Sequence, residues 1–209
     1  MNGLRDLSTI QWYIIPLLAI VVYIWTIEIR KARESGNWNP VWAGAAVFGM
    51  DFINETWNGW VFHVTQHSAF WTTPGPTALR TLIGWNIEIM FMFAILGLIY
   101  GNTISEDYDE KILGISNHWF YVIMYSIICV FVEVILNIGG QLVWEYPWWN
   151  ASITGIWLIF FIGYFPFFTM ALIVINLRED KHRKMVLGAI YGFAIIGNIV
   201  CLGILGWVY

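Results

Sequence analysis

The sequence predicts an all-α protein: a polytopic membrane bundle of about six transmembrane helices with both termini on the non-cytoplasmic side. Of its 209 residues, 59% are hydrophobic and only 11% are charged, whereas soluble domains are nearer a quarter charged. Several apolar runs are long enough to cross about 30 Å of hydrocarbon. The basic residues gather in alternate loops. We therefore expect one multi-pass transmembrane domain that covers residues 1–209.

Turn, cap and charge signals divide the first half of the chain into elements. A basic cluster that begins at Arg30 ends the first apolar run, and Glu28 beside it is expected to be an interfacial charge. Asn39 followed by Pro40 is a cap and a first-turn proline, which marks the start of the second helix. The turn-rich stretch 72–76 precedes the third helix. The predicted helices are residues 10–29, 41–62, 79–100, 117–138, 152–176 and 185–208.

The second half of the chain is divided by loops of distinct composition. An acidic connector, residues 101–116, separates the third and fourth helices, and two glycines at 139–140 end the fourth. A basic loop, residues 178–184, precedes the sixth helix. Small residues let membrane helices approach closely. We therefore expect close packing through the glycines of the sixth helix, which are Gly188, Gly192, Gly197, Gly203 and Gly206.

The distribution of lysine and arginine predicts the orientation. The loops after the first, third and fifth helices hold eight of the ten basic residues, which are Arg30, Lys31, Arg33, Lys111, Arg178, Lys181, Arg183 and Lys184. The opposite side has only Arg5 and Arg80. Cytoplasmic loops of membrane proteins carry the excess of positive charge. This pattern predicts a protein of the bacterial inner membrane or the endoplasmic reticulum with those three loops in the cytoplasm.

Carboxyl groups inside the apolar runs are the main functional signal. Asp51 and Glu55 fall on one face of the second helix, and Glu88 and Glu133 lie in the third and fourth. A charge at the bilayer centre costs about 2.5–3.5 kcal/mol on an insertion scale, so these groups should face the protein interior. Counted from the helix ends, the three glutamates share a layer about 7–14 Å below the outer boundary, with Asp51 deeper. We predict all four as catalytic, with a protonated carboxyl as general acid and an ionised neighbour as base.

Amides and aromatic rings are expected to line the same cavity. The predicted substrate-binding residues are Asn58, Asn86, Asn137, Trp57, Trp85 and Phe62. Trp157 and Tyr164 are further candidates, because aromatic faces stabilise cations. The remaining tryptophans near helix ends are assigned to interfacial belts; they are Trp12, Trp38, Trp42, Trp71, Trp144, Trp148, Trp149 and Trp207.

The histidines suggest a metal site only in part. His63 and His67 have an i, i+4 spacing that suits one metal ion. His118 and His182 are expected on the opposite side of the membrane, so they would not complete the site. We therefore predict neither a metal nor a cofactor.

The acidic second helix carries a family resemblance. The segment Asp51-Phe52-Ile53-Asn54-Glu55-Thr56-Trp57, followed in the third helix by Trp85-Asn86-Ile87-Glu88, resembles the small integral-membrane terpene cyclases of fungal meroterpenoid and indole-diterpene type and their bacterial relatives. In that family an acid within the second helix takes part in protonating an epoxide or alkene, and Glu55 matches it. The family usually has a seventh helix and a second essential acid near the C-terminus, which this sequence lacks. The resemblance covers the first half of the chain and implies a metal-independent cyclase.

These observations lead to one functional hypothesis and two alternatives. The hypothesis is an integral-membrane cyclase or isomerase that protonates an epoxide or alkene of a prenyl-type lipid taken from the bilayer. The alternatives are a proton- or cation-coupled carrier or channel and a subunit of a larger membrane complex. Interhelical hydrogen bonding by the acids would fit the last of these. No basic patch suits nucleic acid, and the two cysteines, Cys129 and Cys201, lie in apolar runs typical of core residues.

Overall fold

The computed structural model describes residues 4–105, 107 and 109–209, and most of them are helical. The helices are α1 (Ile14–Ser35), α2 (Asn39–Thr65), α3 (Ile87–Thr103), α4 (Asn117–Ile138), α5 (Ile153–Leu158), α6 (Phe165–Asn176) and α7 (Asp180–Asn198). Two π-helical segments, Ile159–Tyr164 and Ile199–Ile204, join α5 to α6 and extend α7, and a 3-10 turn covers Leu7–Thr9. The predicted all-α class is therefore right for the bulk of the described chain.

Three short antiparallel strand pairs were not expected. The strands are β1 (Trp71–Thr72), β2 (Arg80–Leu82), β3 (Trp85–Asn86), β4 (Lys111–Ile112), β5 (Ile115–Ser116) and β6 (Val143–Trp144). β2 pairs with β3 and β4 with β5, while β1 pairs with β6 from the far side of the sequence. Strands of two or three residues are too short to show an alternating pattern. Their hydrogen bonds fold the loops back against the ends of the helices.

The predicted helix boundaries agree best with the structure where the sequence has strong turn or cap signals. The fourth helix was predicted at 117–138 and is observed at Asn117–Ile138. The third was predicted from residue 79 and begins only at Ile87, because the preceding residues form the β2–β3 hairpin. The side chain of Asn86 caps this helix by accepting a hydrogen bond from the Ile89 amide at 2.9 Å. The predicted start of the third helix was therefore wrong.

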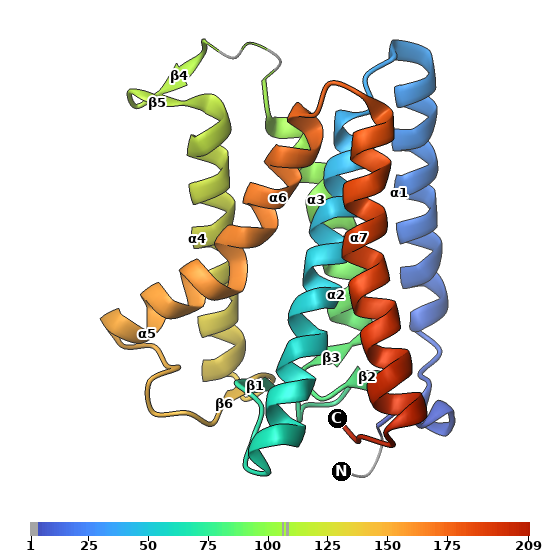
Figure 1. Ribbon diagram of the computed structural model, residues 1–209, viewed down its shortest axis with the longest axis vertical. Helices are drawn as coiled ribbons and strands as arrows, with labels where there is room; N and C mark the ends of the chain where they lie inside the picture. Colours follow the sequence, from blue (N-terminus) through green and yellow to red (C-terminus); the bar gives the residue numbers. More distant parts are fainter. Residues whose placement is uncertain (1–3, 106, 108) are drawn as a thin grey trace.

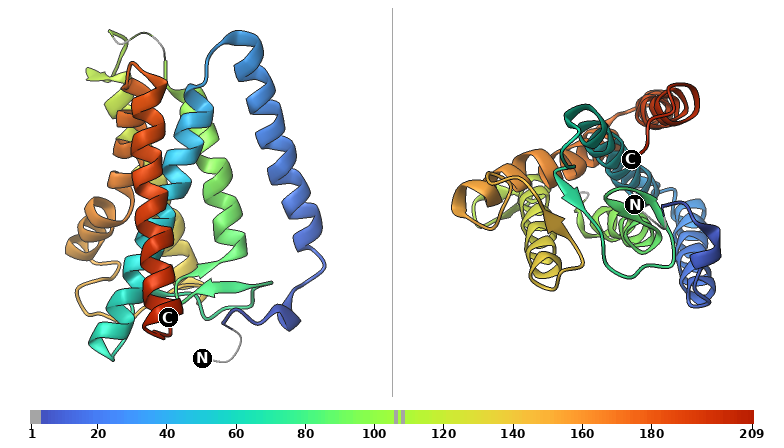
Figure 2. Two further views of the ribbon diagram at one scale, coloured as in Figure 1. Left: turned by 45° about the vertical axis from the view of Figure 1, so that its right-hand side comes forward. Right: turned by 90° about the horizontal axis from the view of Figure 1, so that it is seen from below.

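The helices lie side by side in one bundle (Figure 1). Leu4 bridges to Arg80 at the end of the bundle that holds the β2–β3 hairpin and the C-terminus, and the helix ends and turns that carry most of the basic residues lie at the other end. α2 lies at the centre and packs against α1, α3, α6 and α7 (Figure 2). Its buried residues include Asp51 and Glu55. The helix that carries the acids is thus the one that the others surround.

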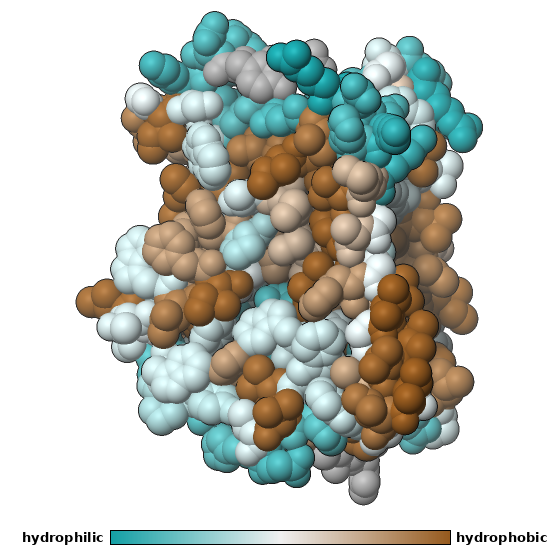
Figure 3. Space-filling model, viewed as in Figure 1, coloured by the Kyte–Doolittle hydropathy of each residue, from teal (hydrophilic) through white to brown (hydrophobic). Residues whose placement is uncertain are grey.

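Within the described chain, three helices are long and apolar enough to cross a membrane: Asn117–Ile138, Ile153–Asn176 and Asp180–Ile204. α3 is apolar but shorter. The face of the bundle in Figure 3 has hydrophilic residues at both ends and its most hydrophobic residues between them. This distribution matches a membrane helical bundle. The count of about six spans stays a prediction.

The helices α2 and α3 pack closely through glycines. A Cβ added at Gly97 would stand 2.8 Å from the Gly44 Cα and 2.8 Å from the Val47 Cβ. By contrast, a Cβ at Gly188, Gly192 or Gly203 would meet nothing within 4 Å. Close packing through the sixth predicted helix was therefore wrong for these three glycines. Gly197 of the same predicted helix does pack closely, because a Cβ added there would stand 2.7 Å from the Trp60 ring of α2.

This difference gives a stability prediction. Gly97→Ala is expected to destabilise the protein by about 1–3 kcal/mol, because overpacking a well-filled contact forces backbone shifts. Gly192→Ala is the matched control and should be tolerated, because its added methyl group meets open space. Thermal unfolding in detergent measures both variants. Equal melting temperatures for the two would contradict the observed α2–α3 packing.

A bend separates α5 from α6, visible as the change of direction in Figure 1. Pro166 in the first turn of α6 lacks an N–H and its ring disfavours continuous helix before it. The π-helical segment Ile159–Tyr164 takes up the distortion. It brings the Gly163 carbonyl to the α2 side chain Asn54, which donates to it at 3.5 Å. The bend therefore directs this segment toward the acidic face of α2.

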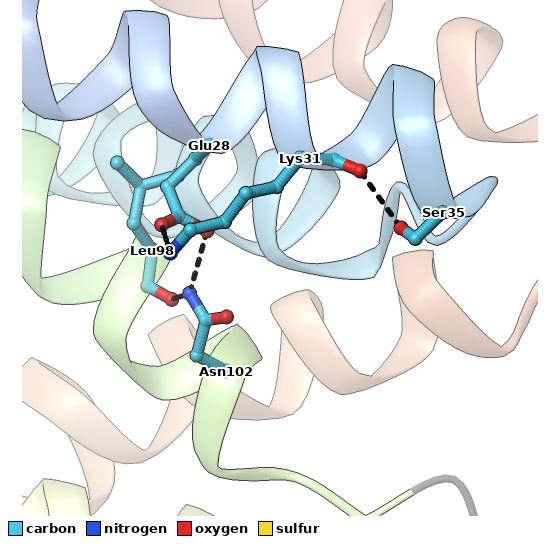
Figure 4. Close-up of polar contacts among 5 residues, drawn as sticks. All are labelled: Glu28, Lys31, Ser35, Leu98 and Asn102. Atoms are coloured by element: carbon cyan, nitrogen blue, oxygen red, sulfur yellow. Dashed lines mark hydrogen bonds and ion pairs between the residues drawn. The ribbon is translucent and has the colours of Figure 1, made fainter.

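A separate polar cluster lies at the basic end of the bundle (Figure 4). Glu28 of α1 is buried, pairs with the Lys31 ammonium at 2.7 Å and accepts a hydrogen bond from the Asn102 amide at 2.9 Å. Asn102 belongs to α3, so the cluster ties α1 to α3. Glu28 was predicted as an interfacial charge and is a partnered structural residue.

Candidate functional site

A cavity of about 110 Å³ lies among α2, α3, α4 and the π-helical segment before α6. Its polar lining consists of Asp51, Asn54, Glu55, Glu133 and Tyr164. The rest of the lining is apolar or aromatic, with Trp71, Phe93, Cys129, Trp149 and Phe167 among its larger members. No lysine, arginine or histidine of the described chain lines it. We call this space the acid cavity.

Each of the three acids is fixed by a tryptophan. The three carboxylates are no more than 5% exposed, and each accepts one hydrogen bond from an indole N–H. The pairs are Asp51 with Trp85 at 2.7 Å, Glu55 with Trp71 at 2.7 Å and Glu133 with Trp144 at 2.8 Å. An indole N–H only donates. Each tryptophan therefore orients its carboxyl group without supplying or removing a proton.

Glu55 differs from the other two acids. Its Oε2 atom is buried and accepts no hydrogen bond of good geometry among the described residues, although the carboxyl group interacts with the Asn58 side chain. The Nε1 atom of Trp149 is also buried without a partner, and the Trp149 ring stacks on Trp71 with 5.8 Å between ring centroids. Buried polar atoms without partners are uncommon in folded proteins. Glu55 and Trp149 both line the acid cavity, so a ligand there would lie beside these two unpartnered groups.

The acids are close enough to affect one another. Glu55 interacts electrostatically with both Asp51 and Glu133. The Tyr164 hydroxyl interacts with Glu133. Where carboxyl groups share a site, a protonated one can act as the general acid and an ionised one as the general base. The arrangement can therefore donate a proton from one group and accept it on another.

The structure places Glu88 outside this group. Its Oε1 accepts hydrogen bonds from the Tyr13 hydroxyl at 2.7 Å and the Ala78 amide at 2.8 Å, and its Oε2 accepts one from Thr77. Glu88 lies in the first turn of α3, because that helix begins later than predicted. The predicted layer of Glu55, Glu88 and Glu133 is therefore not formed. Glu88 instead ties the start of α1 and the loop before β2 to α3.

The three predicted substrate-binding amides do not line the acid cavity. Asn58 accepts from the Phe70 amide and donates to the Trp71 carbonyl, each at 2.8 Å, and so fixes β1. Asn86 caps α3. Asn137 donates to the Leu142 carbonyl at 3.1 Å. In this structure all three anchor backbone near the cavity.

The predicted aromatic residues also lie behind the cavity wall. Trp57 donates to the Asn54 side chain at 2.6 Å, Trp85 donates to Asp51, and Phe62 packs in a separate cluster. Trp157 is 54% exposed and does not line the acid cavity. Among the aromatic candidates, Tyr164 does line the cavity.

Sequence reasoning missed the tryptophans of the loops. Trp71 and Trp149 were assigned to the interfacial belt, yet they are 6% and 1% exposed and line the acid cavity. Trp144 was assigned in the same way and binds Glu133. One signal was available in the sequence: the 14 tryptophans are many for a belt alone.

The histidines and cysteines form no metal-binding group. Among the described residues, no cluster of three or more histidine, cysteine, aspartate or glutamate side chains is arranged to hold a metal ion. The His63 ring stacks on Trp207 at 4.3 Å, and His67 meets Tyr146 edge to face. Cys129 and Cys201 are buried and unpaired by disulfides.

Comparisons with known proteins bear on the class of protein. A family model described as "Uncharacterized membrane protein family" matches residues 1–203. A relative from Archaeoglobus fulgidus, described as an uncharacterized protein, is 45% identical over 205 residues, which is 98% of this chain and 94% of the relative. The comparison with solved structures finds no match. Neither description names an activity, so the resemblance to membrane terpene cyclases stays a prediction.

Proposed function

Since the chain belongs to a family of uncharacterized membrane proteins, we propose that it is a multi-pass membrane enzyme whose acid cavity performs acid–base chemistry on a lipid-soluble substrate. The proposed class is a cyclase or isomerase that protonates an alkene or epoxide of a prenyl-type lipid. The observation that carries this proposal is the unpartnered Oε2 of Glu55, buried in a cavity with two further carboxyl groups. Aromatic rings that suit a cationic intermediate supply much of the remaining wall.

The simplest reaction is an isomerisation that balances within the cavity. Protonated Glu55 gives its proton to one alkene carbon, whose π electrons form the new C–H bond and leave a cation on the next carbon. The carboxylate of Glu133 or Asp51 then takes a proton from an adjacent carbon, and a new double bond forms. Transfer of that proton back to Glu55 restores the starting state, and a cyclisation differs only in an internal C–C bond formed before the last step. No oxidant or reductant is consumed.

The route into the cavity favours a lipid. Met92 of α3 and Ile128 of α4 both line the acid cavity and are 40% and 45% exposed. Their side chains are apolar, so the cavity wall between α3 and α4 would face hydrocarbon rather than water. We propose that the substrate enters sideways from the bilayer through this wall. The basic end of the bundle would be cytoplasmic and both termini would lie outside.

A second candidate is a proton- or cation-coupled carrier. The observation in its favour is that three carboxyl groups share a cavity lined by no basic residue of the described chain. Such a site would bind a cation or exchange protons with water. Conversion of a lipid distinguishes the two functions, because a carrier leaves its cargo chemically unchanged.

The test uses deuterium as a tracer. Purified protein in phosphatidylcholine nanodiscs is incubated in D₂O with a mixture of prenyl alcohols and their epoxides, and products are identified by mass spectrometry. Protonation of an alkene incorporates solvent deuterium at carbon, which an uncatalysed mixture does not. Opening of an epoxide places the deuteron on an exchangeable hydroxyl, so that reaction is recognised by the structure of its product. Proton or cation flux in liposomes, with no altered lipid, would instead replace this proposal with the carrier.

A further inference from the structure

A second pocket of about 250 Å³ adjoins the acid cavity. Ile89, Met92, Leu136 and Leu142 line both spaces, so these apolar side chains form part of the wall between them. The second pocket is also lined by the loop after β1, which lies at the end of the bundle that holds the β2–β3 hairpin and the C-terminus (Figure 1). We call it the outer pocket. A ligand that is longer than the acid cavity would extend into it.

The outer pocket has polar as well as apolar lining residues. Thr73 is only 2% exposed, and its Oγ1 has no hydrogen-bond partner among the described residues. The amides Asn86 and Gln141 line the same pocket. A buried hydroxyl that finds no partner in the protein is uncommon. A polar atom of a ligand in this pocket would provide that partner.

The residues around the outer pocket disfavour a ligand with an ionic head group. Both oxygens of Glu88 are already bound by Tyr13, Thr77 and the Ala78 amide. No basic residue of the described chain lines the pocket itself. Arg80 stands beside it and donates to the carbonyl of the lining residue Gly75 at 3.0 Å. Phosphate groups are bound by arginine or lysine. The available groups are therefore a hydroxyl and amides, which suit a neutral head.

We propose that the outer pocket binds the neutral hydroxyl head of a prenol-type lipid. This rests on the proposed function of the acid cavity and deepens it. With the head at Thr73, the chain segment next to the head passes Met92 and Leu136 and reaches Glu55. The remaining tail leaves between α3 and α4 into the bilayer. The reaction therefore takes place near the polar head, and a phosphorylated lipid is a poor ligand.

Binding of farnesol tests this proposal. Dissociation constants for farnesol are measured by native mass spectrometry of the full chain, with farnesyl phosphate as the comparison. Thr73→Val keeps the shape of the side chain and removes its hydroxyl, and should weaken farnesol binding by up to about tenfold, as expected for one neutral hydrogen bond. Thr169→Val is the matched control: its Oγ1 is likewise buried without a partner, but it lines a different pocket between α4 and α6. That control should bind farnesol like the wild type.

The outcomes separate this inference from the proposed function. Tighter binding of farnesyl phosphate than of farnesol, or equal binding by Thr73→Val and the wild type, would overturn the neutral-head pocket and leave the acid cavity untouched. Weaker binding by Thr73→Val alone, with no deuterium incorporated into any prenyl lipid, would retain the pocket and remove the catalytic role. A diazirine-bearing farnesol that labels residues 73–76 and 141–142 would support the placement directly.

Discussion

Replacing Glu55 with glutamine is expected to lower the rate of lipid conversion by a factor of about 10²–10⁴, the usual contribution of a general acid. Glutamine has nearly the size of glutamate, and its carbonyl oxygen can still accept the hydrogen bond from Trp71. The variant therefore keeps the geometry of the acid cavity and loses the transferable proton. Deuterium incorporation per unit time measures the effect.

The matched control for this variant is Glu145→Gln. Glu145 is an exposed acid in the loop after β6 and does not line the acid cavity. The substitution Glu145→Gln makes the same chemical change away from the acid cavity and should leave the rate of lipid conversion unchanged. Farnesol binding and the melting temperature report whether each variant folds. A folded Glu55→Gln protein that converts lipid at the wild-type rate would rule out Glu55 as the acid.

The part of the site that lies on helices could be anticipated from the sequence. Acids on an apolar helix must face the protein interior, and the 3.6-residue period places Asp51 and Glu55 on one face of α2. Glu133 lies on a helix whose bounds were predicted correctly, and it does line the same cavity. For these three residues, solvation and helix geometry were enough to place them together.

The part that lies in loops could not be anticipated. The depth of Glu88 in the membrane was counted from a helix start at residue 79. The helix begins only at Ile87, because Gly84 lies in a tight turn and Asn86 caps the helix. The partners of the acids depend on pairing between distant segments. Trp71 stands opposite Trp144 in the β1–β6 ladder. No local pattern reports such a contact, because two-residue strands have no periodicity to detect.

The same loop geometry makes Gly84 a sensitive position beside the acids. A Cβ added there would stand 2.5 Å from the Glu55 Oε2, 2.6 Å from the Trp71 Nε1 and 2.7 Å from the Asn58 Nδ2. Real Cβ atoms do not approach other atoms so closely. Asn58 is fully buried and holds β1 through two backbone hydrogen bonds. The Glu55 carboxyl group, or the Trp71 indole that holds it, must therefore shift.

Gly84→Ala is accordingly expected to lower lipid conversion by about 10²-fold while every acid remains in the chain, because displacing a reacting group by about 1 Å can cost that much. Gly188→Ala is the control, since its added methyl group meets nothing within 4 Å. The informative measurement is the rate of deuterium incorporation, taken together with farnesol binding in the outer pocket. Unchanged binding with a reduced rate would locate the defect at Glu55. A Gly84→Ala protein with the full wild-type rate would show that the position of the Glu55 carboxyl group does not limit the reaction, and the role given to its unpartnered oxygen would then be wrong.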